Sequence, residues 1–466
     1  MIEDPDLVTC DTPKEKHWIF DGMAVIRAMK PKPNWGIFTE SFIKACTPAS
    51  ESKPISIAII MDTYEEGRVK EMTQKRRGKI TTRKIMISGP DQGMPQPKDW
   101  PSFLFDNENK TCLIKFIADY CKTEKIQSML KVPLTITAGS SEWRITRNQV
   151  QELPSCNHHE ADTRIIHHAM LSTLPTVVVA SDTDIFILLL YAIQQQKESG
   201  EPKNVHMRID AGRYVNVRAV ANGLPDDVLK NLPAYHSITG CDTTSYPFKV
   251  GKVKPLKKAM KNNKMNLLDN FGALEYGNEM TKAEKFLQTM MYGGKENETI
   301  VQTRCKMYER QKQKNSSSLI PDESSVLEHL KRAKYQSIIW NQCQKRDIIY
   351  PDPEEYGWIN DEGLKPCWFT CPQLPPSLTK KTKKGKKKEL SIGYEADTEE
   401  SESEEPPAKK TKRSPVQNRA SDADISESED PQSEFTDNTS DNFESEGSID
   451  ISSFDESDSD DSDYLQ

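Results

Sequence analysis

The sequence lacks any apolar run of about 18 residues, the length that a membrane-spanning helix requires. Its 10 cysteines stand at irregular spacings, and the one close pair, Cys367 and Cys371 in "CWFTC", makes neither a disulfide framework nor a zinc finger. The opening "MIEDPDLVTC" is acidic and lacks the features of a signal peptide. These absences predict reduced thiols, no membrane partner, and a nuclear or cytoplasmic location, with the nucleus favoured.

Charge is divided unevenly along the 466 residues, although the formal net charge is only −8. Residues 391–466 carry 24 acidic and 5 basic side chains, a net charge of −19. Residues 1–390 carry 58 basic and 47 acidic side chains, a net charge of +11. A basic body of this kind favours a polyanionic partner, and we expect nucleic acid, with DNA favoured over RNA.

The chain divides into four expected segments. Residues 1–15 form a leader, 16–224 an α/β core and 225–375 a mainly helical part, while 376–466 form a disordered tail, because a stretch rich in Ser, Asp and Glu buries too little apolar surface to offset its ordering entropy. Lysine runs in the tail, such as "PPAKKTKR", indicate nuclear-import signals or a solvated linker. The acidic end is a candidate for phosphorylation or for binding basic proteins.

Within the core, short apolar runs alternate with helical patterns. The runs "HWIFD" (17–21), "ISIAIIMD" (55–62) and "PTVVVASD" (175–182) each end in an aspartate, and "VHMRID" (205–210) is a fourth expected strand. Continuous apolar strands separated by helices predict a mostly parallel sheet covered on both faces. Ligands of such sheets gather at the carboxyl ends of the strands, where three aspartates are expected. The predicted helices cover 22–30, 65–79, 112–123, 161–173 and 183–196.

Two close pairs of acids accompany these strands: Glu160 and Asp162 in "HHEADTR", and Asp182 and Asp184 in "SDTD". Residues two apart diverge by about 200° on a helix but share a face of a strand or extended loop, so pairs at a strand end or helix start can converge on one site. Each pair alone is also typical of an ordinary helix N-terminus, where acidic side chains cap the helix.

Several carboxylates in one cleft repel one another unless cations neutralise them. Oxygen ligands without Cys or His suit Mg²⁺ or Mn²⁺, and two such ions ~4 Å apart can activate water against a phosphodiester. Histidines cluster nearby, but no HExxH spacing indicates a zinc protease. We interpret His159 as capping or packing, with contact to substrate as the alternative, and His236 and Cys241 as structural.

The motifs "HHEADTR", "VVVASDTDIFILLL" and "HSITGCDTTS", in this order, resemble the flap-endonuclease (XPG-like) branch of the PIN-like nuclease superfamily. The intervals, 20 residues from Asp162 to Asp182 and 58 from Asp184 to Asp242, are similar to those of the family. "WIFDGMAVI" and "IAIIMDTYEEGRVKEMTQKRR" resemble its first two motifs. The wording "HEADTR…DTD…TGCDTT" is closer still to XPG-like, Asteroid-like proteins of animals, some of them of mobile-element origin.

This resemblance implies a PIN-like three-layer sandwich and a site that holds two Mg²⁺ or Mn²⁺ ions. It implies that Lys70 and Arg76 (or Arg77) hold the scissile phosphate, although an exposed basic helix face would look the same. The segment after Asp242, "CDTTSYPFKVGKVKPLKKAMK", keeps Gly251 and several lysines but not the paired glycines of the family's duplex-gripping hairpin. The implied metal ligands are Asp21, Asp62, Glu160, Asp162, Asp182, Asp184 and Asp242.

Two functions follow. The first is a metal-dependent nuclease that hydrolyses phosphodiester bonds in DNA or RNA by a two-metal mechanism. The alternative is a catalytically inactive nucleic-acid-binding or scaffold protein of mobile-element origin, which would keep the fold and the basic surface. A carboxylate-rich phosphatase is disfavoured because neither a phosphate-binding glycine loop nor a DxDxT motif is present.

Overall fold

The computed structural model describes most of the chain up to residue 370, and all of the described residues belong to one unit. The expected tail, 376–466, and most of the expected leader lie outside them. The described ranges are 8–9, 12–48, 54–64, 68–69, 83–200, 203–210, 212–275, 277–310, 318–361 and 363–370.

A single large sheet organises the described residues, with nine strands in the order β1-β9-β8-β7-β2-β3-β4-β5-β6. The central strands β8, β7, β2, β3 and β4 are parallel, and antiparallel strands extend the sheet at both sides. The strands are Val8–Thr9 (β1), Lys16–Asp21 (β2), Pro54–Ile60 (β3), Leu134–Ala138 (β4), Ser141–Ile145 (β5), Val150–Leu153 (β6), Thr176–Val179 (β7), Val205–Asp210 (β8) and Arg213–Asn216 (β9).

Alternation along the central strands divides the core into two layers. Successive side chains of a strand point to opposite faces. In β2, Trp18 and Phe20 pack into one apolar cluster and Ile19 into the other, and β3 and β7 divide in the same way. Both faces are therefore apolar, which explains why these strands read as continuous hydrophobic runs.

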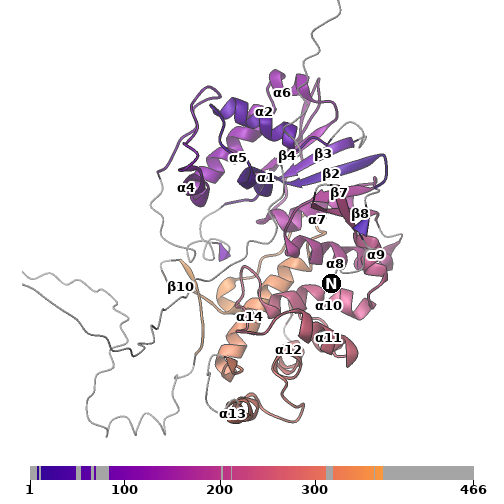
Figure 1. Ribbon diagram of the computed structural model, residues 1–466. Coiled ribbons are helices and arrows are strands. Elements are labelled where there is room, and N and C mark those ends of the chain that lie inside the picture. The colour runs from indigo at the N-terminus through magenta and orange to yellow at the C-terminus, as the bar shows by residue number, and fades with distance from the viewer. Residues whose placement is uncertain are drawn as a thin grey trace, which may run out of the picture. The chain divides into compact units, whose positions relative to one another are not determined.

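Helices cover both faces of the sheet (Figure 1). On the Trp18 face lie α1, α2, α4, α5 and α6, and on the Ile19 face lie α7, α8 and α9. The expected α/β fold, a mainly parallel sheet between helical layers, is confirmed and is consistent with a PIN-like sandwich. The helices are Gly22–Ala28 (α1), Trp35–Ala45 (α2), Trp100–Phe105 (α4), Asn107–Cys121 (α5), Glu124–Met129 (α6), Ala161–Leu171 (α7), Thr183–Ser199 (α8) and Val217–Asn222 (α9).

Further helices follow α9 and pack on the Ile19 side of the core. One apolar cluster runs from Ile19 to Cys343 and crosses the boundary expected between residues 224 and 225. Described helices of this part are Asp226–Thr239 (α10), Val253–Lys261 (α11), Met265–Leu268 (η3), Glu279–Phe286 (α12), Leu287–Met291 (η4, a π-helix), Ile300–Arg310 (α13), Glu323–Trp340 (α14) and Pro353–Tyr356 (η6); Trp358–Asn360 (β10) and Leu364–Pro366 (β11) form a small hairpin.

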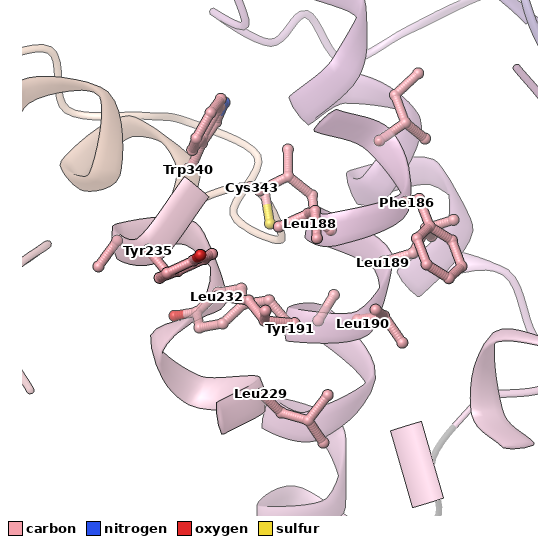
Figure 2. Packing of buried hydrophobic residues seen from close by; sticks show 14 of the residues in the cluster. Phe186, Leu188, Leu189, Leu190, Tyr191, Leu229, Leu232, Tyr235, Trp340 and Cys343 are labelled. Carbon is pink, nitrogen blue, oxygen red and sulfur yellow. The ribbon is translucent and has the colours of Figure 1, made fainter. Parts of the chain in front are cut away.

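Helix α8 is buried along its apolar run "IFILLLYAI", residues 185–193. A helix that is apolar on all sides needs partners all round; α8 packs against α7, α9 and α10 and shares its apolar cluster with one face of the sheet. Figure 2 shows Leu188 and Tyr191 of α8 facing Leu232 and Tyr235 of α10. This packing holds the first turn of α8 at the carboxyl edge of the sheet, next to α10.

The sequence prediction was close for the central strands and their helices. All four expected strands exist, but β3 ends at Ile60 and β7 at Val179, so the following aspartates lie on turns rather than on the strands themselves. Of the helix expected over 65–79, all but residues 68 and 69 lie outside the described residues. In the part of the chain that is described, no helix is long and apolar enough to cross a membrane.

Candidate functional site

Three neighbouring strands bring aspartates to one edge of the sheet. Asp21, the last residue of β2, pairs in register with Ile60 of β3, and Asp62 follows two residues later. On the other side of β2, Phe20 pairs with Val179 of β7, and Asp182 follows that strand. Parallel neighbours lie about 4.8 Å apart. Asp21, Asp62 and Asp182 therefore lie at the same carboxyl edge, where α/β proteins bind ligands.

Two of these aspartates cap helices. Asp21 is the N-cap of α1, and its Oδ1 accepts hydrogen bonds of 3.0 Å from the backbone N–H groups of Met23 and Ala24. Asp182 is the N-cap of α8, and its Oδ1 accepts a 2.8 Å bond from the Asp184 N–H. The capping interpretation is thus correct for Asp182, and the cap that Asp21 makes was not expected. A carboxylate has two oxygens and about four lone-pair sites, so a cap does not prevent it from binding a further ligand.

Asp62 joins β3 to the helix that carries the first acidic pair. Its Oδ1 accepts a 3.0 Å hydrogen bond from the Ala161 N–H, and the Tyr64 hydroxyl donates to its Oδ2 at 3.1 Å. Glu160 is the N-cap of α7, and Asp162 lies in its first turn. The contact therefore places both acids of the "HHEADTR" motif beside the end of β3, as the sequence predicted for a helix start.

Asp184 belongs to a polar chain that reaches α10. Its Oδ1 lies 2.6 Å from Nε2 of His236, while Nζ of Lys252 lies 3.1 Å from Nδ1 and 3.4 Å from Nε2 of that ring. A carboxylate only accepts, so Nε2 donates its proton to Asp184, while the Lys252 ammonium lies against the face of the imidazole ring. The interpretation of His236 as merely structural missed this contact, because a histidine six residues before Asp242 gives no signal of its own.

The loop after α10 brings Asp242 to the same region. Asp242 is exposed there, next to the buried Cys241. Burial raises the pKa of the Tyr246 hydroxyl, and Cys241 and the carboxylates of Asp242, Asp184 and Asp182 raise it further. One tyrosine hydroxyl therefore lies within electrostatic range of three of the seven predicted acids.

Arg27, on α1, is a basic residue that the sequence interpretation missed. Burial lowers the pKa of its guanidinium, but Tyr64, Asp62 and Asp21 outweigh that effect and the pKa is raised. Its side chain hydrogen-bonds Tyr64. A positive group thus stands between the acids that follow β2 and β3, and offsets part of their mutual repulsion.

A second basic residue, Arg68, acts on the same two tyrosines, Tyr335 and Tyr350, as Glu160 does. Burial raises the pKa of both Tyr335 and Tyr350; Glu160 raises them further and Arg68 lowers them. The ring of His159 stacks on Tyr350 at 3.5 Å between centroids and 4° between planes, which is the packing role expected for it. The start of the "HHEADTR" motif is therefore anchored against Tyr350.

A pocket of about 380 Å³ opens beside Asp62, Thr63 and Tyr64. Its other walls come from α5 and from the hairpin of β4 and β5, including Trp143 of β5. The sequence interpretation did not anticipate strands β4 to β6, so it could not place this pocket. Its position adds solvent-accessible space next to the acidic edge.

The metal-ligand role of the seven acids stays a prediction. Among the residues that the structure describes, no group of three or more His, Cys, Asp or Glu side chains is arranged to hold a metal ion. The predicted phosphate-binding residues Lys70 and Arg76, and the alternative Arg77, lie outside the described residues.

In comparisons with known proteins, no family model and no curated protein matches the chain. Among solved structures, the chain is similar to the flap endonuclease of bacteriophage T5, in a pseudo-enzyme–product complex with DNA and metal ions. The alignment covers 59% of this chain and 85% of that chain, at 12% identity and a TM-score of 0.31. At these values the likeness does not establish a family, so the flap-endonuclease resemblance stays a proposal.

Proposed function

We propose that this protein is a divalent-metal-dependent nuclease that hydrolyses phosphodiester bonds in nucleic acid, with DNA favoured over RNA. The observation that carries the proposal is the shared edge of β3, β2 and β7. Acids that follow all three strands meet there with the first turns of α7 and α8. This edge is where an α/β sheet binds its ligand.

The donor set fits a hard cation. Carboxylate oxygens without thiolate are the ligands preferred by Mg²⁺ and Mn²⁺. When bound, a pair of such ions supplies an activated water and stabilises the leaving oxygen of a phosphodiester. The residues proposed to hold them are Asp21, Asp62, Glu160, Asp162, Asp182, Asp184 and Asp242.

Neighbouring side chains have supporting roles. His236, held by Lys252, orients the Asp184 carboxylate. Arg27 brings positive charge to Asp21 and Asp62, where it can also meet a phosphate oxygen. By the family resemblance, Lys70 and Arg76 add to that phosphate contact.

Charge supports a nucleic-acid substrate. The net +11 of residues 1–390 attracts a phosphate backbone over the range of the Debye length. The lysine runs of the tail support a nuclear location, and its acidic end is proposed to compete with nucleic acid or to bind basic proteins. Binding is therefore expected to weaken with added salt.

A second candidate is an inactive nucleic-acid-binding or scaffold protein, and the observation that favours it is helix capping by two of the proposed metal ligands. Asp21 and Asp182 each have a structural role at a helix N-terminus that would persist without catalysis. A protein that had lost its activity could keep both residues for that reason.

Cleavage of branched and single-stranded DNA in Mg²⁺ or Mn²⁺ distinguishes the two. Wild-type protein is expected to cleave, and an Asp182→Asn/Asp184→Asn variant is not. Asp226→Asn is a matched control, since Asp226 opens α10 beside Lys197, at the opposite end of α8. Cleavage that is equal in the double variant, or absent from the wild type, would contradict the nuclease and favour the second candidate.

A further inference from the structure

The loop that follows Asp242 lines a pocket of about 250 Å³ with aromatic side chains. Tyr246, Phe248, Trp368 and Phe369 are 55%, 49%, 45% and 41% exposed there. In the described part of the chain, only one other aromatic side chain, Tyr308, is exposed to this extent. A surface that gathers exposed rings from two distant segments is a candidate binding site.

Three of these rings have a basic side chain within about 6 Å of the ring centroid. Nζ of Lys252 lies 5.6 Å from the ring centroid of Tyr246, and Nζ of Lys249 lies 5.2 Å from that of Phe248. These distances are within the range of cation–π attraction. The guanidinium of Arg332, a buried residue of α14, lies 5.1 Å from the ring centroid of Trp368. We call the four exposed rings, Tyr246, Phe248, Trp368 and Phe369, the aromatic rim of the pocket. The rim combines apolar ring faces with positive charge.

Tyr246 connects this rim to the acidic edge. It packs on Gly240, where a Cβ would lie 2.5 Å from its Cδ1 atom, and Gly240 has a φ of +107°, which favours glycine. Lys252, which lies over the Tyr246 ring, also contacts His236, whose Nε2 lies 2.6 Å from Asp184. One side chain thus borders both the acids and the aromatic pocket.

We infer that this rim binds the unpaired bases of a single nucleic-acid strand and leads the strand toward the acidic edge. Proteins that bind single strands without sequence preference combine aromatic stacking platforms with a positive groove that follows the backbone. The inference deepens the proposed nuclease by naming an unpaired strand as its substrate. In this account the rim takes the place of the family's duplex-gripping hairpin, because the sequence after Asp242 lacks the paired glycines of that hairpin.

Charge complementarity favours a nucleic acid over an apolar peptide. Helix α11 follows directly on Lys252 and carries Lys254, Lys257, Lys258 and Lys261, with no acid in its sequence "VKPLKKAMK". An apolar peptide needs no cations beside the rings, whereas a strand with one phosphate per base uses both features.

Fluorescence anisotropy in EDTA tests the rim apart from catalysis. The probes are labelled 15-nucleotide single strands, as oligo-dT and oligo-U, and a blunt DNA duplex of the same length. Phe248→Ala and Trp368→Ala are each expected to weaken single-strand binding about 5- to 150-fold, the loss of one stacked base. Duplex binding should change less than about twofold, since paired bases offer no face to stack on.

Tyr308→Ala on α13 is the matched control, because Tyr308 is exposed to a similar degree but does not line the pocket. Phe248→Tyr and Trp368→Phe retain a ring and are expected to bind as the wild type does. If loss of the rings weakens binding of either oligo-dT or oligo-U, the result supports the inference. The probe that binds more tightly shows whether the preferred strand is DNA or RNA.

Equal losses for single strand and duplex, no loss, or the same loss in Tyr308→Ala would overturn the inference. Thermal unfolding of each variant identifies any loss that comes from misfolding. An Asp182→Asn/Asp184→Asn variant that binds normally but does not cut separates the two proposals. Failure of cleavage alone leaves this binding result intact.

Discussion

At the scale of single residues, Asp21 has two roles that one substitution can separate. Its Oδ1 caps α1 through the N–H groups of Met23 and Ala24, and its position beside β3 and β7 makes it a proposed metal ligand. Asparagine caps a helix about as well as aspartate but carries no charge, whereas alanine does neither.

We predict that Asp21→Asn abolishes metal-dependent cleavage while the free energy of unfolding changes by less than about 0.5 kcal/mol. Asp21→Ala should abolish cleavage and also cost about 1 kcal/mol, because the cap is lost. Urea unfolding and a cleavage assay on the same preparations measure both quantities. Full activity in Asp21→Asn would show that this acid is a cap and nothing more.

Single residues also show which features of the site could be predicted from the sequence and which could not. The motif "SDTD" predicts an acidic helix start, which Asp182 and Asp184 confirm. It does not predict that Asp184 meets His236, because that contact depends on how α8 packs on α10. The same holds for Arg27, whose link to Tyr64 and Asp62 crosses from α1 to the turn after β3.

At the scale of elements, the sequence predicts best where both faces are apolar. β2 and β7 read as continuous hydrophobic runs because each packs between two helical layers. Strands β4 to β6, residues 134–153, mix apolar and charged residues at the antiparallel side of the sheet, so their pattern is weaker. Helix α2, over Trp35–Ala45, was likewise not expected.

A buried ion pair joins two of the later helices. Lys334 of α14 is fully buried, and its Nζ donates to Glu279 Oε1 of α12 at 3.0 Å and to the carbonyl oxygens of Ala273 and Glu275 at 2.7 and 3.1 Å. Burial lowers the pKa of Lys334, and Glu279 opposes that shift. The lysine therefore ties the chain before α12 to α14.

Removing one partner should be costly. We predict that Lys334→Met lowers the free energy of unfolding by about 3–5 kcal/mol, because Glu279 is left buried without its partner. Lys334→Met/Glu279→Gln should recover part of that loss. Lys365→Met, at an exposed pair with Asp361, should cost less than about 1 kcal/mol. Equal losses for Lys334→Met and Lys365→Met in urea unfolding would contradict this role.

At the scale of the whole molecule, acid should destabilise the fold through buried histidines. Burial lowers the pKa of His329 from 6.5 to about 4, while its Nε2 donates to the Ile238 carbonyl oxygen at 2.9 Å. Between these pH values the unfolded chain binds a proton that the folded chain does not. The free energy of unfolding therefore falls as the pH falls from 6.5 to 4.

We predict that His329→Gln reduces that fall by ~2–3 kcal/mol, since glutamine can donate to Ile238 but does not titrate. Urea unfolding at a series of pH values from 8 to 4 measures it, and the values at pH 8 give the cost of the substitution itself. Parallel curves for the variant and the wild type would show that His329 keeps its ordinary pKa when folded.

Metal binding tests the central claim most directly, because the account requires acids far apart in the sequence to hold cations together. Titration of Mn²⁺, followed by the electron paramagnetic resonance signal of the free ion, counts the bound ions without any substrate. Wild-type protein and Asp226→Asn should bind about two ions per chain, and Asp21→Asn/Asp182→Asn should bind fewer. An unchanged count in that double variant, or no bound Mn²⁺ in the wild type, would contradict the account.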